Sequence, residues 1–178
     1  YEPLRHYAEV WLSLEPGERG SGITFSADCP PNTLDLNWQR LIETHVFERT
    51  HPGVLTGSPL TDVRIRLIAG RAPPKHTEGG DFREATCRAI RNALMQADNV
   101  LLEPVVRFEL AMPLEALSRV TGELLRIGAQ LDAPETEEDE VTLTGSCTAA
   151  MFWDYPTKFA ASTRGHGRIA SWFYRYEP

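Results

Sequence analysis

The sequence predicts an α+β protein of two domains. In several short segments apolar residues alternate with polar ones, as in half-buried strands, and in others they recur every three or four residues, as on one face of a helix. These segments follow in the order β-β-α-β-α over residues 1–98 and β-α-β-β-α-β over residues 99–178. We expect the domain boundary near Asn99, where a predicted helix ends and a new strand begins.

Two strands open the first domain. Apolar and polar residues alternate over residues 7–14, and the alternation resumes at Ile23 and Phe25. Residues 15–22, between these strands, consist mostly of residues that favour turns, four of them Gly or Pro. This arrangement predicts a β-hairpin.

A helix, a strand and a second helix complete the first domain. Apolar residues at helical spacing predict a helix over residues 34–50, which a Pro-Gly pair ends. Alternation predicts a strand over residues 63–67. An irregular stretch follows at residues 70–80, and one apolar face over residues 82–97 predicts the second helix.

The second domain has the element order of the split βαβ, or ferredoxin-like, fold. Alternation identifies its four strands, and apolar residues spaced three and four apart identify its two helices. The predicted elements are a strand over residues 101–112, a helix over 114–128, strands over 130–134 and 141–147, a helix over 149–160 and a strand over 168–176.

The overall charge argues against a nucleic-acid partner. The 178 residues include 18 Lys and Arg against 25 Asp and Glu, a net charge of −7, and acidic proteins repel phosphate. Five of the acids, however, lie within residues 135–140, which we expect at the solvated tip of a hairpin. Only Lys75 and Lys158 are lysines, so most contacts to phosphate would come from arginine, which binds it in a bidentate manner.

No segment approaches the ~18 to 20 consecutive apolar residues that a membrane-spanning helix needs, so we expect no membrane partner. The chain begins at Tyr1, without Met or a charged-then-apolar leader. We therefore expect it to be part of a longer cytoplasmic protein. The wide spacing of Cys29, Cys87 and Cys147 predicts three reduced, buried or half-buried thiols rather than a disulfide or zinc site.

Motifs for catalysis are missing from the sequence. There is no G-K-[ST] phosphate loop and no G-x-S-x-G elbow, and residues 165–170 match G-x-G-x-x-A only ahead of a strand, where a turn is expected. His45 and His51 flank a helix end, and we expect caps or surface residues there rather than metal ligands. We therefore expect no catalytic residue, no metal and no cofactor in this chain.

Four aromatic residues gather on the last predicted strand, namely Trp172, Phe173, Tyr174 and Tyr176. Ferredoxin-like sheets can stack RNA bases on aromatic side chains. The RNA-recognition signature places those aromatics on the first and third strands, however, and neither has it here. We favour an alternation of core and surface aromatics and keep RNA stacking as the alternative.

The stretch at residues 72–80 is a candidate binding loop. It is longer than a tight turn, contains two prolines, and places Lys75 beside His76 between a predicted strand and a predicted helix. Binding residues concentrate in loops that a rigid scaffold holds. An ordinary connecting loop fits the same residues.

Three segments resemble domains IV and V of elongation factor G and its relatives. Residues 53–65, G-V-L-T-G-S-P-L-T-D-V-R-I, resemble the G-V-L-x-G-x-P-x-x-D-V-x-V segment of domain IV. Residues 101–104, L-L-E-P, resemble the opening of domain V, and residues 163–168, T-R-G-H-G-R, followed by Y-E-P at 176–178, resemble its end. The order and spacing of the three segments match the family.

The resemblance implies a ribosomal S5-like domain IV over residues 1–98 and a ferredoxin-like domain V over residues 99–178. Neither domain is catalytic in this family. GTP and Mg²⁺ would belong to a GTPase domain elsewhere in the parent protein. The implied partner is the ribosome, with no DNA or membrane partner, and we expect the 178-residue chain to be monomeric.

The loop at residues 75–82 departs from the H-D-V-D-S-S tip of the translocase, and its G-D-F ending is more similar to the tetracycline-resistance ribosomal protection proteins. Those translational GTPases enter the ribosomal A site and dislodge tetracycline with the tip of domain IV. The resemblance implies that two tip loops contact small-subunit rRNA at the decoding centre. Their residues are Pro73, Pro74, Lys75, His76 and Thr77 in one loop and Pro3, Leu4, Arg5 and His6 in the other.

Two other functions stay open at this point. A paralogue of elongation factor G that acts in translocation would share all of these segments. A freestanding ferredoxin-like module that binds a small molecule would share only the element order of the second domain.

Overall fold

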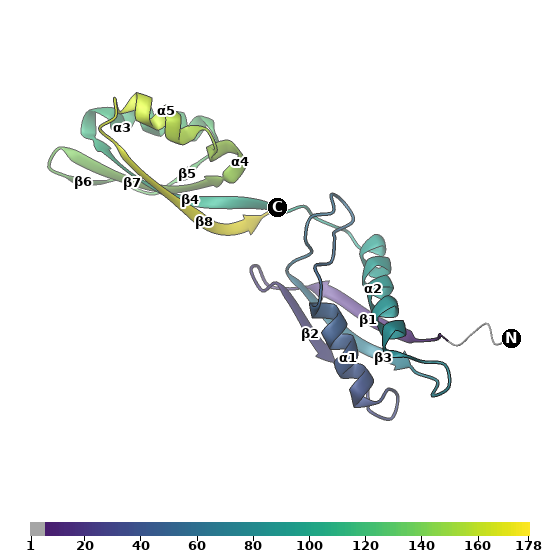
Figure 1. Ribbon diagram of the computed structural model, residues 1–178. Coiled ribbons are helices and arrows are strands. Elements are labelled where there is room, and N and C mark those ends of the chain that lie inside the picture. The colour runs from purple at the N-terminus through teal and green to yellow at the C-terminus, as the bar shows by residue number, and fades with distance from the viewer. Residues whose placement is uncertain (1–5) are drawn as a thin grey trace. The chain divides into compact units, whose positions relative to one another are not determined.

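A computed structural model describes residues 6–178 of the protein (Figure 1). The chain divides into two compact units, one ending at Val100 and the other beginning at Leu101. Each unit combines a sheet with helices, which confirms the predicted α+β class. Within residues 6–178, no helix has the length and apolar character needed to cross a membrane.

The first unit is a three-stranded sheet with two helices packed on one face. Its core contains Ile42 of the first helix, Phe82 of the second and Leu67 of the central strand, all fully buried. The elements are β1 (Glu9–Pro16), β2 (Ile23–Ala27), α1 (Leu36–Phe47), β3 (Val63–Arg71) and α2 (Gly79–Gln96).

The predicted hairpin of β1 and β2 is wrong. The strand order is β1-β3-β2, so β3 lies between the two strands that the sequence places next to each other. β1 pairs with β3 antiparallel and β2 pairs with β3 parallel, and Leu14 and Phe25 both lie opposite Ile65. The alternation of residues identified the strands correctly, but it contains no information about which strand is the partner.

Asp62 stabilises the connection between β1 and β2, residues 17–22, by hydrogen bonds. Its carboxylate accepts hydrogen bonds from the backbone N–H of Gly22 at 3.1 Å and from the Thr61 hydroxyl at 3.2 Å. Its own backbone oxygen accepts one from the Gly17 N–H at 2.7 Å, and its φ of 56° lies in the left-handed region. Burial alone would raise the pKa of Asp62, but the hydrogen bonds, chiefly from Gly20 and Gly22, outweigh it and lower the pKa.

We therefore expect Asp62 to stabilise the first unit at neutral pH and to lose this contribution in acid. Because its pKa is lowered on folding, the contribution is complete above the ordinary value of 3.8 and disappears as the pH falls through the lowered pKa. Asp62→Asn keeps a residue that tolerates a positive φ. The substitution should lower the free energy of unfolding by about 1 kcal/mol at pH 6. Denaturant titrations of both proteins at pH 6 and pH 3 measure the difference, and an equal difference at both pH values would refute the role.

His45 and His51, expected as caps or surface residues, are both buried. The His51 ring nitrogen Nε2 lies 2.8 Å from the backbone oxygen of Val46 in the last turn of α1, which is a capping contact. His45 lies in the same turn, with Nδ1 3.3 Å from a carboxylate oxygen of Glu48. The expected cap is thus present at His51, but neither side chain is on the surface. After this helix end Pro52 pairs with Pro59 in an isolated antiparallel bridge, and the Leu60 N–H donates to the His51 oxygen at 2.8 Å.

The second unit is a five-stranded antiparallel sheet with helices on one face (Figure 1). Its strand order, β5-β7-β4-β8 with β6 also paired to β7, is the predicted ferredoxin-like one. The elements are β4 (Glu103–Pro113), a 3₁₀ turn (Leu114–Ala116), α3 (Leu117–Arg126), β5 (Gln130–Leu131), β6 (Glu135–Glu137), β7 (Glu140–Thr148), α4 (Ala149–Phe152), α5 (Tyr155–Ser162) and β8 (Arg168–Glu177).

Two interactions fix the helices of this unit. Phe108 of β4 stacks on Phe152 of α4 with ring centroids 5.0 Å apart. The buried carboxylate of Glu123 in α3 accepts hydrogen bonds from the Ser162 hydroxyl at 2.8 Å and the Tyr155 hydroxyl at 3.4 Å, and so ties α3 to α5. Burial and the charge of Glu123 raise the pKa of Tyr155, which keeps the phenol protonated as the donor.

The acidic run and the thiols agree with expectation, with one addition. Residues 135–140 are exposed and form a hairpin whose turn contains Glu138 at a φ of 53°. The first three residues of the run, 135–137, were expected in the hairpin tip but form the additional strand β6. Cys29 and Cys147 are buried and Cys87 is half-buried, and all three are free thiols.

The aromatic residues of β8 do not alternate between core and surface. Trp172, Phe173, Tyr174 and Tyr176 are all exposed, from 45% to 56% of their area. β8 is an edge strand that pairs only with β4, and a register shift at Val105 interrupts the pairing beside these residues. Trp172 and Phe173 lie opposite half-buried Arg107 and Val106, and Tyr176 lies opposite exposed Pro104. The structure does not test RNA stacking on these rings, which was the alternative.

Candidate functional site

The loop between β3 and α2 is the part of the candidate site that the structure describes completely. The backbone N–H of His76 donates a hydrogen bond to the oxygen of Pro73 at 3.0 Å, which closes a turn with Pro74 and Lys75 in the middle. Pro74 and Lys75 are exposed, whereas Pro73 and His76 are half-buried. Proline at the second turn position has its φ fixed in advance, so the turn presents the Lys75 ammonium group from a rigid backbone.

Residues 6 and 7, where the described part of the chain begins, lie beside this loop (Figure 1). The N–H of Tyr7 donates to the oxygen of His76 at 2.7 Å, and the Thr77 hydroxyl donates to the oxygen of Tyr7 at 2.6 Å. His6 is described and exposed, and its ring nitrogen Nδ1 lies 3.1 Å from a carboxylate oxygen of Asp81. The other three predicted residues of this segment, Pro3, Leu4 and Arg5, lie outside the described residues.

Asp81 is a site residue that the sequence analysis missed. One of its oxygens accepts the backbone N–H of Glu78 at 2.8 Å and completes a capping box at the start of α2, while the other faces His6. Glu78 and Asp81 have the spacing of a capping box but not its usual residue types, Ser or Thr at the cap and Glu or Gln three residues later, so the signal was weak. The same carboxylate thus fixes the helix start and the neighbouring segment.

Phe82 anchors the base of the loop in the core. Its ring is fully buried and lies against Trp38 of α1, with the centroids 5.0 Å apart. The loop therefore leaves the core at Ala72, which packs against the same cluster, and returns to it at the fully buried Phe82. Such a base holds an exposed turn in one orientation.

The chemistry that these residues offer is binding rather than catalysis. Lys75 supplies a charge, His6 and His76 supply imidazole rings, and the remaining exposed groups of the turn are backbone amides and proline rings. In residues 6–178 no group of three His, Cys, Asp or Glu side chains is placed to hold a metal ion. A rigid, weakly cationic turn is suited to a phosphate-bearing surface with a narrow opening.

Comparison with known proteins gives matches for both halves of the chain. The family model for domain IV of elongation factor G matches residues 1–98, and the model for the C-terminus of elongation factor G matches residues 100–178. The tetracycline resistance protein TetP of Clostridium perfringens is 33% identical over 171 residues. Elongation factor G 2 of Desulfotalea psychrophila is 30% identical over the same length.

These alignments cover 96% of this chain but 26% and 25% of the two relatives, so the chain spans about a quarter of the curated proteins that it matches. A crystal structure of a protein from Thermus thermophilus superposes with a TM-score of 0.86 over 94% of this chain and 25% of that one. Its sequence identity is 24%, so this likeness supports the fold alone.

Proposed function

Because the chain belongs to the elongation factor G family, of which it contains domain IV and the C-terminal domain, we propose that it is the ribosome-binding part of a translational GTPase that enters the ribosomal A site. The observation that supports this most strongly is the hydrogen bonding of Tyr7, from one segment, to His76 and Thr77 of the other, next to an exposed Lys75. In this proposal the two loops contact small-subunit rRNA at the decoding centre.

The physical properties of the tip suit such a partner. A proline-stiffened turn loses little conformational entropy when it enters a narrow RNA pocket. Lys75 can pair with phosphate although the chain carries a net charge of −7, because salt screens the charges that lie more than ~10 Å from the ammonium group.

The catalytic activity of the parent protein is placed outside these residues. We assign GTP and Mg²⁺ to a G domain elsewhere in a longer cytoplasmic protein, and we assign to this chain binding alone, as a monomer. Both halves match consecutive domains of one family. This order disfavours the freestanding small-molecule module as an alternative.

Within the family we favour ribosomal protection against tetracycline over translocation. Gly80, Asp81 and Phe82 form the G-D-F ending that resembles the protection proteins, and two of these three residues hold the tip in place. The chain's similarity to TetP is compatible with this choice. Translocation stays the second candidate, because the similarity to elongation factor G 2 is nearly as high.

Expression of the full-length gene in a tetracycline-sensitive host distinguishes the two functions. We expect growth at tetracycline concentrations that stop the host with an empty vector. In parallel, the same gene is expressed while the host's own elongation factor G is depleted. Rescue of the depleted host without any gain in tetracycline tolerance, with the protein present at the same level, would assign translocation instead.

A further inference from the structure

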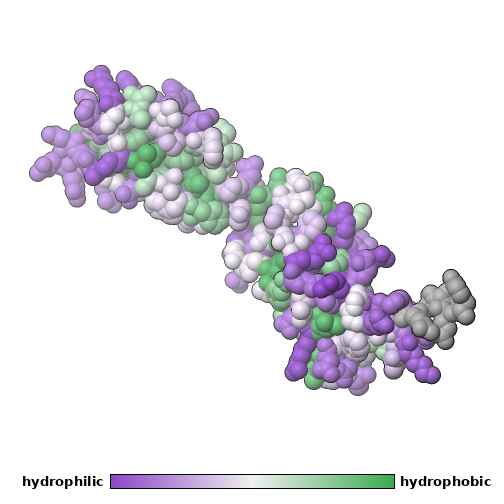
Figure 2. Space-filling model, viewed as in Figure 1, coloured by the Kyte–Doolittle hydropathy of each residue, from purple (hydrophilic) through white to green (hydrophobic). Residues whose placement is uncertain are grey.

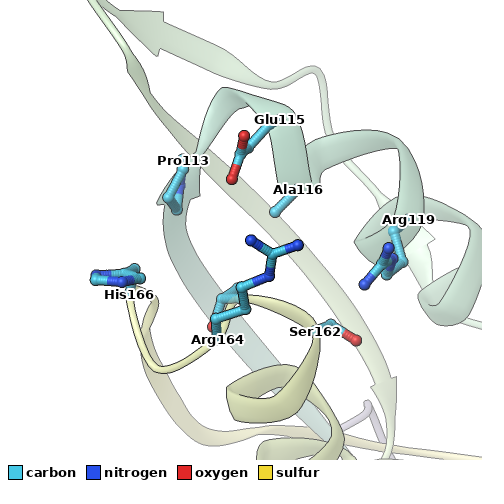
Figure 3. A pocket seen from close by; sticks show the side chains of 8 residues that line it. Pro113, Glu115, Ala116, Arg119, Ser162, Arg164 and His166 are labelled. Carbon is cyan, nitrogen blue, oxygen red and sulfur yellow. The ribbon is translucent and has the colours of Figure 1, made fainter.

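A pocket in the second unit lies between the start of α3 and the end of α5, away from the tip loops in sequence and in unit (Figure 3). It has a volume of about 330 Å³. Its wall is formed by residues of the β4–α3 connection and of the α5–β8 connection. They are Pro113, Glu115, Ala116, Arg119, Ser162, Thr163, Arg164 and His166.

Positive charge predominates in this pocket. Arg119 enters from α3 and Arg164 from the opposite connection, and His166 lies on the other side of Arg164, near Pro113 (Figure 3). Glu115 is the one carboxylate of the lining. Neither arginine is engaged by a carboxylate of the described residues. The ion pairs that residues 6–178 form with arginine use Arg66, Arg83, Arg88, Arg107, Arg168 and Arg175. Figure 2 shows the mixed polar and apolar surface of the protein from the side drawn in Figure 1.

Arg164 has a backbone conformation that disfavours arginine, which indicates that its side chain has a function at this position. Its φ is 52°, and Gly165 follows with a φ of 78°, so the chain leaves α5 through two left-handed residues. Glycine or asparagine occupies such positions at lower cost than arginine. Non-glycine residues held in this region concentrate at functional positions.

Most other donors of the pocket are already occupied. The Ser162 hydroxyl donates to the buried Glu123 at 2.8 Å, and the Thr163 hydroxyl donates to the oxygen of Phe159 at 2.9 Å. The backbone N–H groups of Arg164 and His166 donate to carbonyl groups within the same turn. The side-chain donors left to a ligand are the two guanidinium groups and the His166 ring.

We propose that this pocket binds a phosphate group, held by the guanidinium groups of Arg119 and Arg164 with His166 as a third donor. Planar guanidinium forks match the oxygens of phosphate in a bidentate manner, which distinguishes this ligand from a simple halide. The phosphate can belong to an RNA backbone or to a free phosphate compound. The inference concerns the second unit and does not depend on the proposed ribosomal function.

A titration of the isotope-labelled 178-residue chain with inorganic phosphate tests the site, with amide NMR shifts as the readout and sodium chloride at equal ionic strength as the blank. We expect shifts concentrated at residues 162–167. Arg119→Gln and Arg164→Asn should each weaken binding about tenfold, and asparagine accepts the left-handed backbone. Glu115→Gln should strengthen it about threefold.

Arg126→Gln is the matched control, because Arg126 is an exposed arginine of the same helix outside the pocket. Unchanged amide positions away from the pocket confirm that each variant is folded. Equal phosphate affinity in all variants, or shifts spread over the surface, would overturn the proposal. A single-stranded RNA 12-mer forms the second arm: shifts at residues 162–167 assign an RNA phosphate, and shifts with inorganic phosphate alone assign a free phosphate compound.

Discussion

The double substitution Pro74→Gly and Lys75→Ser is expected to weaken binding of the full-length protein to ribosomes by at least tenfold. Loss of the Lys75 charge removes a charge-assisted contact to phosphate, of the order of 1.5–3 kcal/mol. Loss of proline gives the unbound turn more conformations, which adds about 0.4–1 kcal/mol. Sedimentation of the protein with ribosomes measures the change, and tetracycline tolerance should fall with it.

The same substitution should leave the fold intact, because both side chains are exposed and neither is a partner in the hydrogen bonds that close the loop. We expect the free energy of unfolding to change by no more than about 0.5–1 kcal/mol. Lys158→Ser is the matched control, since Lys158 is the only other lysine and is exposed on α5. If the tip variant binds ribosomes as well as this control does, the tip is not the contact.

Phe82→Ala should destabilise the first unit by about 3–5 kcal/mol, which is the usual cost of deleting a fully buried phenylalanine ring. The ring is completely buried and packs against Trp38, so the substitution leaves a cavity between α1 and α2. Hydrogen exchange of the buried β3 amides, such as those of Ile65 and Leu67, reports the stability of this unit separately.

Phe47→Ala is the control for this prediction, because Phe47 is a phenylalanine of the same unit that is 53% exposed. Phe47→Ala should lower the free energy of unfolding of the first unit by less than about 1 kcal/mol. Equal exchange rates in the two variants would show that Phe82 does not anchor the unit. Because Phe82 follows the tip loop directly, its loss should also weaken ribosome binding, in this case together with a loss of stability.

The sequence contained the elements of the fold but not their pairing. Alternation identified β1, β2 and β3, but it could not show that β3 lies between the other two. Ile65 of β3 has its two partners, Leu14 and Phe25, 51 and 40 residues away in the chain. The prediction that the aromatic residues of β8 alternate between core and surface was wrong for a similar reason. Their exposure follows from the position of β8 at the sheet edge, which periodicity does not encode.

The candidate site could be predicted only in part from the sequence. Prolines and Lys75 marked residues 72–80 as a possible binding loop, but they fitted an ordinary connection equally well. The contacts of Tyr7 with His76 and Thr77 join segments about 70 residues apart, and no local pattern reports such a contact. The spacing of Asp81 to Glu78 gave only a weak indication of its capping role, and its second contact, to His6, required the structure.

The most direct test of the proposed contact is hydroxyl-radical probing from the tip. Lys75→Cys in the full-length protein, with Cys87 and any other reactive cysteine replaced, allows an iron chelate to be attached at position 75; Cys29 and Cys147 are buried. The proposal predicts cleavage of small-subunit rRNA at the decoding centre, and none there from a chelate at Lys158→Cys. Ribosome binding by the labelled protein without cleavage of small-subunit rRNA from position 75 would contradict it.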